Sequence, residues 1–529
     1  MLILSSIAAV MMAVAVLTEL RRDLMMFQQN SYRHERYMKW LRASGDTTSV
    51  SRLLALVILF IGLCGLRIEL LSMSAMCIYG LIRTYQLVTA KYKKPLVMTA
   101  RAARIYVTAV TLTLICVAVT LILFSDGVEQ ATAIAAIAFT GAYCLSHVII
   151  LTSGFILAPV EKSINRGYYN DAKSRLESMP DLKIVGITGS YGKTSTKHYL
   201  YRILSEHYDT CMTPGSYNTT LGVIRTIREY LKPYNEVFIV EMGAKQTGDI
   251  KEICDLVHPT IGIVTAVGPQ HLESFHTIEN VRDTKFELVD ALPGNGLAVI
   301  NDDFEMISGR EVNNTRVVRY AVRNIAGAEF MADDIQYSPQ GTTFAINGPD
   351  GFSMLLTTRL LGECNISNLL AAVVVAIDLG VPVDKIRYAV SQIEPVEHRL
   401  SMKRTAGGLT IIDDAFNSNP SGSSMALDVL SMMTAGERIV ITPGMIELGE
   451  KQYELNREFG CKIAKSCDYA YIVGQYNRQA ILEGITDGGM SEDRVKTFDT
   501  FLEAQTYLIK TFHAGDTVLY ENDLPDTFK

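Results

Sequence analysis

The sequence predicts an α-helical membrane domain followed by α/β domains with mostly parallel sheets, and two observations support this fold class. Apolar runs concentrate before residue 158, where 14 Lys and Arg stand against 7 Asp and Glu, whereas the remainder holds 35 and 49. Beyond residue 181, strand-like runs alternate with helical runs, a pattern typical of α/β folds. The predicted domains are a transmembrane domain over 1–158, an amphipathic connector over 159–180, a central domain over 181–398 and a C-terminal domain over 399–529.

The overall composition excludes several classes of protein. The net charge is −7 and the isoelectric point is about 5.8, which argues against a nucleic-acid-binding protein. The nine cysteines contain no CxxC pair, so the sequence indicates neither a disulfide framework nor a zinc site. Hydrophobic residues make up 48% of the chain, which excludes intrinsic disorder.

The first 158 residues contain apolar runs near 1–20, 53–69, 70–88, 105–124 and 131–157. A helix of about 20 residues spans the hydrocarbon core of a bilayer. Segments 21–52 and 89–104 carry seven and five Lys or Arg, and such basic loops stay in the cytoplasm. Five crossings satisfy this rule and place the N-terminus outside and everything after residue 158 in the cytoplasm. Four crossings would violate it.

Charged residues within these runs are few, and His147 is the clearest ionisable group of the last run. A proton or ion pathway requires more intramembrane charges than this. The sequence therefore favours a membrane anchor over a transporter. The amphipathic pattern after residue 158 suits either an interfacial helix or a plain connector.

A phosphate-binding loop is indicated after the apolar run Leu182–Thr188, because a glycine-rich segment and then a helical pattern follow it. The segment consists of Gly189, Ser190, Tyr191, Gly192, Lys193, Thr194 and Ser195. Glycines let backbone N–H groups face phosphates, Lys193 reaches the β- and γ-phosphates, and Thr194 can ligate Mg²⁺. The alternative is a chance glycine-rich turn, and Ile187 stands where the common pattern has its first glycine.

Polar side chains end several further strand-like runs. Glu241 ends VFIVE, His271 follows IGIVTAVGPQ, and Asp413 and Asp414 end LTIIDD. In open α/β sheets ligands bind at the carboxyl ends of strands, so Glu241 and His271 are candidates to hold a metal ion at the phosphates. Taken singly, Glu241 could instead be a helix cap and His271 an ordinary loop histidine.

Six motifs occur in order along residues 180–529, namely GSYGKTS, VEMGA, VGPQHLESF, NISNLLAA, EHRL and DDAFNSNP. Together they resemble the Mur ligase family, the ATP-dependent enzymes that form amide bonds in peptidoglycan synthesis. DDAFNSNPSG and GMIELGE are most similar to the branch that adds D-Ala-D-Ala to a UDP-linked muramoyl peptide. The resemblance implies a central ATP-binding domain with a phosphate loop and a C-terminal Rossmann-like domain.

The resemblance also implies the roles of individual residues. Residues implied to bind ATP are Gly189, Ser190, Gly192, Lys193, Thr194, Ser195, Asn365, Asn368, Arg399, Asp414 and Asn417. Residues implied to hold one or two Mg²⁺ are Thr194, Glu241, His271 and Lys285, the last after carbamylation. Lys193, His271, Lys285 and Arg399 are expected to act in catalysis, and Ser216–Thr220 to lie near the acyl acceptor and the metal. Without the resemblance, Lys285 reads as a surface lysine of a helix.

Two departures from the family pattern concern the substrates. Cys364 replaces the histidine of the usual GxHNxxN motif, which bears on the adenine side of the site. The apolar region 1–158 stands where these ligases carry a soluble domain that binds the UDP moiety. The carboxyl substrate is therefore expected to be either UDP-linked or lipid-linked.

The expected function is an ATP-dependent, ADP-forming ligase that acts through an acyl phosphate. It would add an amino acid or dipeptide of the D-Ala-D-Ala type to a cell-wall precursor at the cytoplasmic face of a bacterial inner membrane. The expected partners are the lipid bilayer, the precursor and the amine, and no nucleic acid. A membrane-bound ligase of the polyglutamate-synthase type is the first alternative, and an ATP-driven transporter the second.

Overall fold

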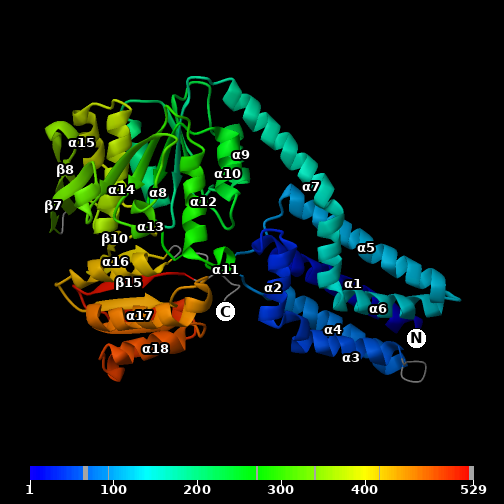
Figure 1. Ribbon diagram of the computed structural model, residues 1–529. Coiled ribbons are helices and arrows are strands. Elements are labelled where there is room, and N and C mark those ends of the chain that lie inside the picture. Colours follow the sequence, from blue (N-terminus) through cyan, green and yellow to red (C-terminus); the bar gives the residue numbers. More distant parts are fainter. Residues whose placement is uncertain (64–68, 93, 270–271, 339–340, 416–417, 524–529) are drawn as a thin grey trace. The chain divides into compact units, whose positions relative to one another are not determined.

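The computed structural model describes residues 1–63, 69–92, 94–269, 272–338, 341–415 and 418–523. These residues form two compact units that divide after Arg166. The first unit is helical, and the second contains two β-sheets with helices around them (Figure 1).

The first unit is built around the long N-terminal helix. Its helices are α1 (Leu2–Gln29), α2 (His34–Ser44), η1 (Asp46–Thr48), α3 (Val50–Leu63), α4 (Glu69–Thr89), α5 (Ala100–Phe124), α6 (Val128–Cys144) and the first part of α7 (Ser146–Glu177). Helix α1 contacts α4, α5 and α6. Large apolar side chains remain exposed on the outer faces, among them Phe60 at 67%, Ile122 at 81% and Phe155 at 74%. Such exposure is unusual for a soluble domain and suits contact with lipid.

The helices agree in part with the predicted membrane segments. Among the described residues, α1, α5 and α7 are long and apolar enough to cross a membrane, while Val50–Leu63 and Gln130–Cys144 are shorter apolar helices. The count of five crossings therefore stays a prediction.

The prediction of one helix over 131–157 is wrong, because the chain breaks at Leu145 between α6 and α7. Polar contacts hold this break: Arg52 donates to the carbonyl oxygen of Tyr143 at 3.3 Å and to the hydroxyl of Ser146 at 3.1 Å. Helix α7 then continues through Pro159 to Glu177. The predicted connector 159–180 is thus mostly the second part of α7 rather than a separate helix.

The second unit begins with a nine-stranded sheet in the order β2-β3-β1-β4-β5-β6-β7-β8-β9. Its strands are β1 (Lys183–Thr188), β2 (Thr210–Met212), β3 (Val237–Glu241), β4 (Ile261–Val264), β5 (Leu297–Asn301), β6 (Arg316–Ala321), β7 (Phe330–Ser338), β8 (Gly341–Asn347) and β9 (Ser353–Thr358). Pairing is parallel from β2 to β7 and antiparallel from β7 to β9. The parallel part matches the predicted α/β central domain.

Helices cover both faces of this sheet and bury its apolar side chains. They are α8 (Lys193–Leu204), α9 (Thr220–Glu229), α10 (Asp249–Val257), α11 (Leu272–Phe275), α12 (Ile278–Asp290), α13 (Glu305–Ser308), α14 (Glu363–Asp378) and α15 (Val383–Ser391), with 3₁₀ turns η2 (Ile325–Gly327) and η3 (Pro349–Gly351). One core joins the sheet to α8, α14 and α15, and the other joins it to α9, α10 and α12. The run LLAAVVVA of α14 is buried throughout, which explains why this helix shows no amphipathic pattern.

The C-terminal part of the second unit holds a six-stranded sheet in the order β10-β11-β15-β12-β13-β14. Its strands are β10 (Ser401–Arg404), β11 (Thr410–Asp414), β12 (Arg438–Thr442), β13 (Tyr469–Val473), β14 (Val495–Phe498) and β15 (Thr517–Glu521). Its helices are α16 (Pro420–Ser431), α17 (Gln452–Ser466), α18 (Arg478–Asp487) and α19 (Phe501–Thr511), with η4 (Gly449–Lys451) and η5 (Glu492–Arg494). Only the pair β10–β11 is antiparallel, so the predicted α/β architecture is confirmed.

Candidate active site

The predicted phosphate loop joins β1 to α8 at the carboxyl edge of the central sheet. Gly189 has φ +149° and Gly192 has φ +79°, backbone conformations that L side chains rarely adopt. A Cβ atom on Gly189 would lie 2.1 Å from Thr265 Oγ1, and one on Gly192 would lie 2.2 Å from Asn368 Oδ1. Both glycines are therefore required by the geometry of the loop.

Side chains of the loop tie it to the end of β4. Ser190 Oγ donates to the carbonyl oxygen of Gly268 at 3.1 Å, and Lys193 Nζ donates to the carbonyl oxygen of Gly189 at 2.6 Å. Burial lowers the pKa of Lys193 to about 8, and the positive charge of Arg399 lowers it further while Glu241 opposes the shift. An anionic group bound beside Lys193 would therefore keep this lysine protonated and positively charged.

Glu241, at the end of β3, lies within a cage of polar side chains. Its Oε1 accepts hydrogen bonds from Thr194 Oγ1 and Asn218 Nδ2, both at 3.1 Å. Its Oε2 forms an ion pair of 2.9 Å with Lys197 Nζ. Glu241 is 1% exposed, and the contacts described for its carboxylate come from side chains rather than from the backbone N–H groups of a helix. The structure brings the predicted residues Thr194 and Glu241 together, and it adds Lys197, which the sequence reasoning missed although GKTSTK contains it.

Lys285, on α12, is 1% exposed and is therefore not the surface lysine that the helical pattern alone suggests. Burial lowers its pKa to about 7, with a further contribution from the charge of Lys193, while Glu287 and Asp249 act in the opposite direction. A lysine with this pKa is largely neutral at pH 8. A neutral amine is the form that can react with CO₂, so Lys285 is chemically suited to carbamylation.

Arg399 lies in the segment between the two sheets of the second unit. His398 and Leu400 flank it with φ +58° and +49°, left-handed conformations that cost non-glycine residues energy. Burial lowers the pKa of Arg399, and the charges of Asp414 and Glu241 oppose this shift. Asp414 Oδ1 accepts a hydrogen bond from the backbone N–H of Leu400 at 3.1 Å. Burial raises the pKa of Asp414 to about 6, against the effect of Arg399.

The predicted asparagines of α14 face α8. Asn365 Oδ1 accepts a hydrogen bond from Tyr199 at 2.8 Å, and Asn368 Oδ1 accepts one from Thr196 at 3.2 Å. Ser195 is buried within α8. These contacts fix α8 behind the phosphate loop, whereas a role beside adenine stays a prediction.

His271 and Asn417 lie outside the described residues, so their predicted roles stay predictions.

A cavity of about 720 Å³ adjoins the phosphate loop. Its lining includes Thr194 and His198 of α8, Gly215 and Ser216 of the loop after β2, and residues 392–399. Burial lowers the pKa of His198 to about 4, and the charge of Lys197 adds to this shift. The cavity is therefore lined by a neutral imidazole and bounded by Arg399, and it can accept an anionic group beside Thr194.

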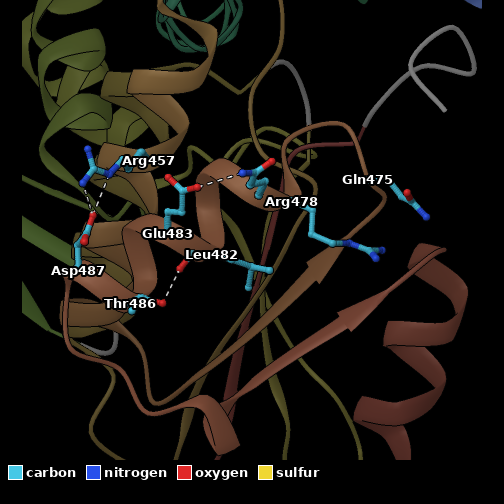
Figure 2. Close-up of a pocket in the computed structure, with 8 residues that line it drawn as sticks. Arg457, Gln475, Arg478, Leu482, Glu483, Thr486 and Asp487 are labelled. Atoms are coloured by element: carbon cyan, nitrogen blue, oxygen red, sulfur yellow. Dashed lines mark hydrogen bonds and ion pairs between the residues drawn. The ribbon is translucent and has the colours of Figure 1, made fainter.

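A second cavity of about 530 Å³ lies on the C-terminal part, between α17 and α18 (Figure 2). Arg457 and Asp487 pair across it at 2.7 Å, and Gln479 donates to Glu483 at 3.2 Å. None of the predicted site residues lines it. Arg457 and Asp487 are exposed and neutralise each other, and Arg478 pairs with Asp499 outside the lining, so this cavity is less suited to binding a charged ligand than the cavity at the phosphate loop.

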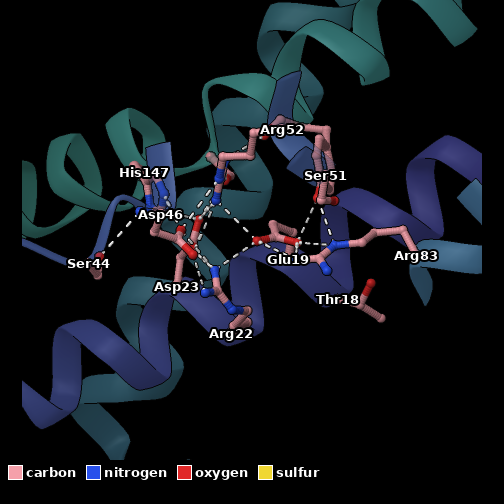
Figure 3. Close-up of polar contacts among 12 residues, drawn as sticks. Thr18, Glu19, Arg22, Asp23, Ser44, Asp46, Ser51, Arg52, Arg83 and His147 are labelled. Atoms are coloured by element: carbon pink, nitrogen blue, oxygen red, sulfur yellow. Dashed lines mark hydrogen bonds and ion pairs between the residues drawn. The ribbon is translucent and has the colours of Figure 1, made fainter. Parts of the chain in front are cut away.

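The helical unit contains a buried group of charged side chains that the sequence did not predict (Figure 3). This α1 cluster consists of Glu19, Arg22, Asp23, Asp46, Arg52, Arg83 and His147. Glu19, Arg83 and His147 come from the predicted apolar runs, so the few ionisable groups of those runs meet charged side chains of the neighbouring segments in this cluster. Sequence separation hid the cluster, because its members come from different helices.

Ligand-type atoms of Asp23, Asp46 and His147 lie within 4.8 Å of one another, as in many metal sites. However, Arg22 donates to Asp46 at 3.0 Å, and Arg52 lies 3.3 Å from Asp23. Each carboxylate is thus neutralised by a guanidinium, and a divalent cation would add excess positive charge to a buried site. The α1 cluster is better suited to joining helices than to holding a metal.

Comparison with known protein families places two domains on the second unit. Residues 187–376 match the Mur ligase middle domain, and residues 398–520 match the Mur ligase glutamate ligase domain.

Curated relatives and solved structures agree with these matches. The UDP-N-acetylmuramoyl-tripeptide–D-alanyl-D-alanine ligase of Escherichia coli K12 is 31% identical over 279 residues, which cover 53% of this chain and 61% of that enzyme. The corresponding enzyme of Bacillus subtilis 168 is 24% identical over 353 residues, 66% of this chain and 75% of its own length. MurF from Acinetobacter baumannii superposes with a TM-score of 0.60 at 26% identity, covering 68% of this chain and 77% of that structure. The fold of the Thermotoga maritima MurF ligase in complex with ADP superposes with a TM-score of 0.61 at 24% identity, covering 68% and 80%.

Proposed function

Because the chain belongs to the Mur ligase family through its middle and C-terminal domains, we propose that it is an ATP-dependent, ADP-forming amide ligase. Its proposed substrates are a carboxylate of a peptidoglycan precursor and an amino acid or dipeptide of the D-Ala-D-Ala type. The relatives that carry this activity by name are the basis for the substrate class. The match spans 61% of the Escherichia coli enzyme, so the activity of the whole chain is a proposal.

The proposed reaction has two steps. The substrate carboxylate attacks the γ-phosphorus of ATP, which forms an acyl phosphate and releases ADP. The amine then attacks the acyl carbon, and phosphate leaves. Most of the catalysis consists of aligning the carboxylate and stabilising charge on the transferred phosphoryl group.

The candidate residues at the phosphates and the metal have the following parts in this scheme. The backbone of the phosphate loop and Lys193 bind the phosphates, and Arg399 adds positive charge from the segment between the two sheets. Thr194, Glu241, His271 and Lys285, the last after carbamylation, are the groups that would hold Mg²⁺, whose charge would neutralise the phosphates. Oxygen ligands are those that Mg²⁺ prefers, and the hydrogen bond of 3.1 Å between Thr194 and Glu241 supports a shared role.

One observation carries this proposal. A loop whose glycines leave no room for a Cβ atom lies beside a buried cluster that contains more basic than acidic side chains. The cluster is called the phosphate-site cluster and consists of Lys193, Lys197, Glu241, Lys285, Arg399 and Asp414. Before Lys285 is carbamylated, four basic side chains face two carboxyls, so the site is suited to an anion as highly charged as a nucleotide triphosphate.

An ADP-release assay on the purified full chain tests the activity. D-Ala-D-Ala is supplied with either UDP-muramoyl tripeptide or its lipid-linked counterpart, and L-glutamate replaces the dipeptide in a parallel reaction. Turnover with the dipeptide supports the proposal, and turnover only with glutamate supports the polyglutamate-type alternative. Absence of turnover with every pair, while ATP still binds, would reject the peptidoglycan assignment.

We further propose that the helical unit anchors the ligase in the bacterial plasma membrane, with the ligase domains in the cytoplasm. The two basic segments lie at one end of this unit, because Gln28 donates to the carbonyl oxygen of Val97 at 2.8 Å and Arg101 stacks over Tyr32. This common location supports a single cytoplasmic end. A ligase anchored in this way would lie beside lipid-linked precursors, so the lipid-linked carboxyl substrate is the preferred arm of the assay.

Cysteine labelling tests the topology. Asp126→Cys, in a variant without the native cysteines, is expected to react with a membrane-impermeant reagent from outside the cell. Labelling only after the cytoplasmic side is opened would contradict the five-crossing arrangement. Ser44→Cys, in the first basic segment, is the matched position for the opposite side.

A further inference from the structure

Lys197 is a buried charged residue to which the scheme above assigns no role beyond its positive charge. It lies one helical turn after Lys193 on α8 and is 0% exposed. A buried ammonium group must be neutralised and hydrogen-bonded, because an unpaired charge in the interior is costly. Lys197 Nζ meets this requirement with Glu241 Oε2 at 2.9 Å and with the carbonyl oxygen of Gly215 at 2.6 Å.

These two contacts join different parts of the site. Glu241 belongs to the end of β3, whereas Gly215 belongs to the loop between β2 and α9. The same loop also contacts Glu241 directly, because Asn218 Nδ2 donates to its Oε1 at 3.1 Å and Thr213 Oγ1 accepts from its backbone N–H at 3.1 Å. Gly215 has φ +49°, so the carbonyl that Lys197 binds belongs to a turn that an ordinary residue would not readily form.

The loop held by Lys197 forms one wall of the cavity at the phosphate loop. Gly215 and Ser216 line this cavity, together with Thr194 and Arg399. A shift of the loop would therefore change the shape of the cavity without moving the phosphate loop itself. Lys197 also directs Glu241, since its ion pair with Oε2 leaves Oε1 facing the hydroxyl of Thr194.

We propose that Lys197 is a positioning residue that locks the loop 213–218 against Glu241 and thereby shapes the site for the carboxyl substrate. The inference rests on the proposed ligase function for its substrate, but the position of the loop can be measured without turnover. Lys197 acts through the loop and through Glu241, and it does not contact the reacting atoms.

The test uses Lys197→Met in the full-length chain, with hydrogen exchange of the loop as the first readout. We expect amide exchange in 213–218 to accelerate at least tenfold, while the phosphate loop keeps its protection. Lys251→Met is the matched control, because it removes a lysine from the exposed surface of α10. Unchanged exchange in the loop would overturn the proposal.

Steady-state kinetics give the second readout. We expect the KM of the carboxyl substrate to rise at least tenfold and that of ATP by less than threefold. Equal losses for both substrates would assign Lys197 to nucleotide binding and overturn the proposal. If the wild-type chain turns over no substrate, the ligase proposal fails, while the exchange experiment still decides the role of Lys197.

Two further variants keep the test decisive if Lys197→Met does not fold. Lys197→Gln keeps a hydrogen-bond donor and replaces Lys197→Met if that variant does not fold, with the same expected results. Asn218→Ala removes the hydrogen bond from the loop to the carboxylate of Glu241, and we expect faster amide exchange in residues 213–218. Loop exchange at the wild-type rate in both variants would contradict the proposed lock.

Discussion

The two units bury charged side chains in different ways. In the α1 cluster, three carboxylates face three arginines, and each carboxylate lies within 3.3 Å of a guanidinium. In the phosphate-site cluster, three lysines and an arginine face two carboxyls. The first cluster is balanced when His147 is neutral, and the second has an excess of positive charge.

This difference separates a structural group of charges from a binding site. A balanced cluster gains nothing from an added ion, and it holds helices in register by paired hydrogen bonds. In the unbalanced cluster, burial lowers the pKa values of Lys193 and Lys285 and repulsion between the cations adds to the shift, so an incoming anion stabilises it. Burial of charge alone therefore does not identify a site, whereas the sign of the excess does.

The largest effect is expected at the phosphate loop. Lys193→Ala should lower the rate of ADP release at least 1,000-fold, because the phosphoryl group loses a charge that no neighbouring backbone group can replace. Thermal unfolding is expected to change little, since Lys193 donates only to carbonyl oxygens of its own loop. Activity close to wild type would show that the excess of positive charge does not serve phosphate binding.

A stability effect of about 3 kcal/mol is expected from Arg52→Met in the α1 cluster, because Glu19 and Asp23 lose a buried partner. Unfolding of the full chain in detergent, followed by denaturant titration, measures it. The double variant Arg52→Met, Asp23→Asn restores the balance and should recover at least half of the loss. A double variant as unstable as the sum of both single changes would contradict the charge-balance account.

A smaller, roughly tenfold effect of pH is expected at Lys285. Its pKa is lowered to about 7, so the neutral amine that reacts with CO₂ falls from about nine-tenths at pH 8 to about one-tenth at pH 6. The carbamate signal of protein equilibrated with ¹³C-bicarbonate should fall in proportion. Lys285→Ala should lack this signal, and a signal that persists in that variant would assign the carbamate to another lysine.

The smallest effect is expected at the cavity of Figure 2. Arg457→Ala breaks an exposed ion pair with Asp487, and such pairs contribute about 0.5 kcal/mol or less. Neither ADP release nor the unfolding midpoint should change measurably. A loss of activity above threefold would make this cavity part of the site.

The sequence predicted the parts of the site that are local in the chain. The strand, the glycine loop and the helix follow one another, so a phosphate loop could be predicted from this local order, although Ile187 departs from the common spacing. Glu241 could be placed because parallel strands bring their carboxyl ends to one edge. The alternation of strands and helices predicted both sheets of the second unit for the same reason.

Contacts between distant residues could not be predicted in this way. Arg52 and Arg83 form ion pairs with Glu19 from other helices, and no local sequence pattern indicates these contacts. Lys285 lies in a charged helical segment, and only packing of α12 reveals that this lysine is buried. The break at Leu145 was missed because hydropathy does not distinguish one long helix from two that bend at a polar contact.

The backbone on either side of Arg399 has a mechanical consequence. His398 and Leu400 adopt left-handed conformations, which cost about 1–2 kcal/mol for each residue with a side chain. The segment between the two sheets is thus strained in its backbone on both sides of Arg399. A change of backbone conformation that relaxes His398 and Leu400 would also change the direction of the Arg399 side chain between them.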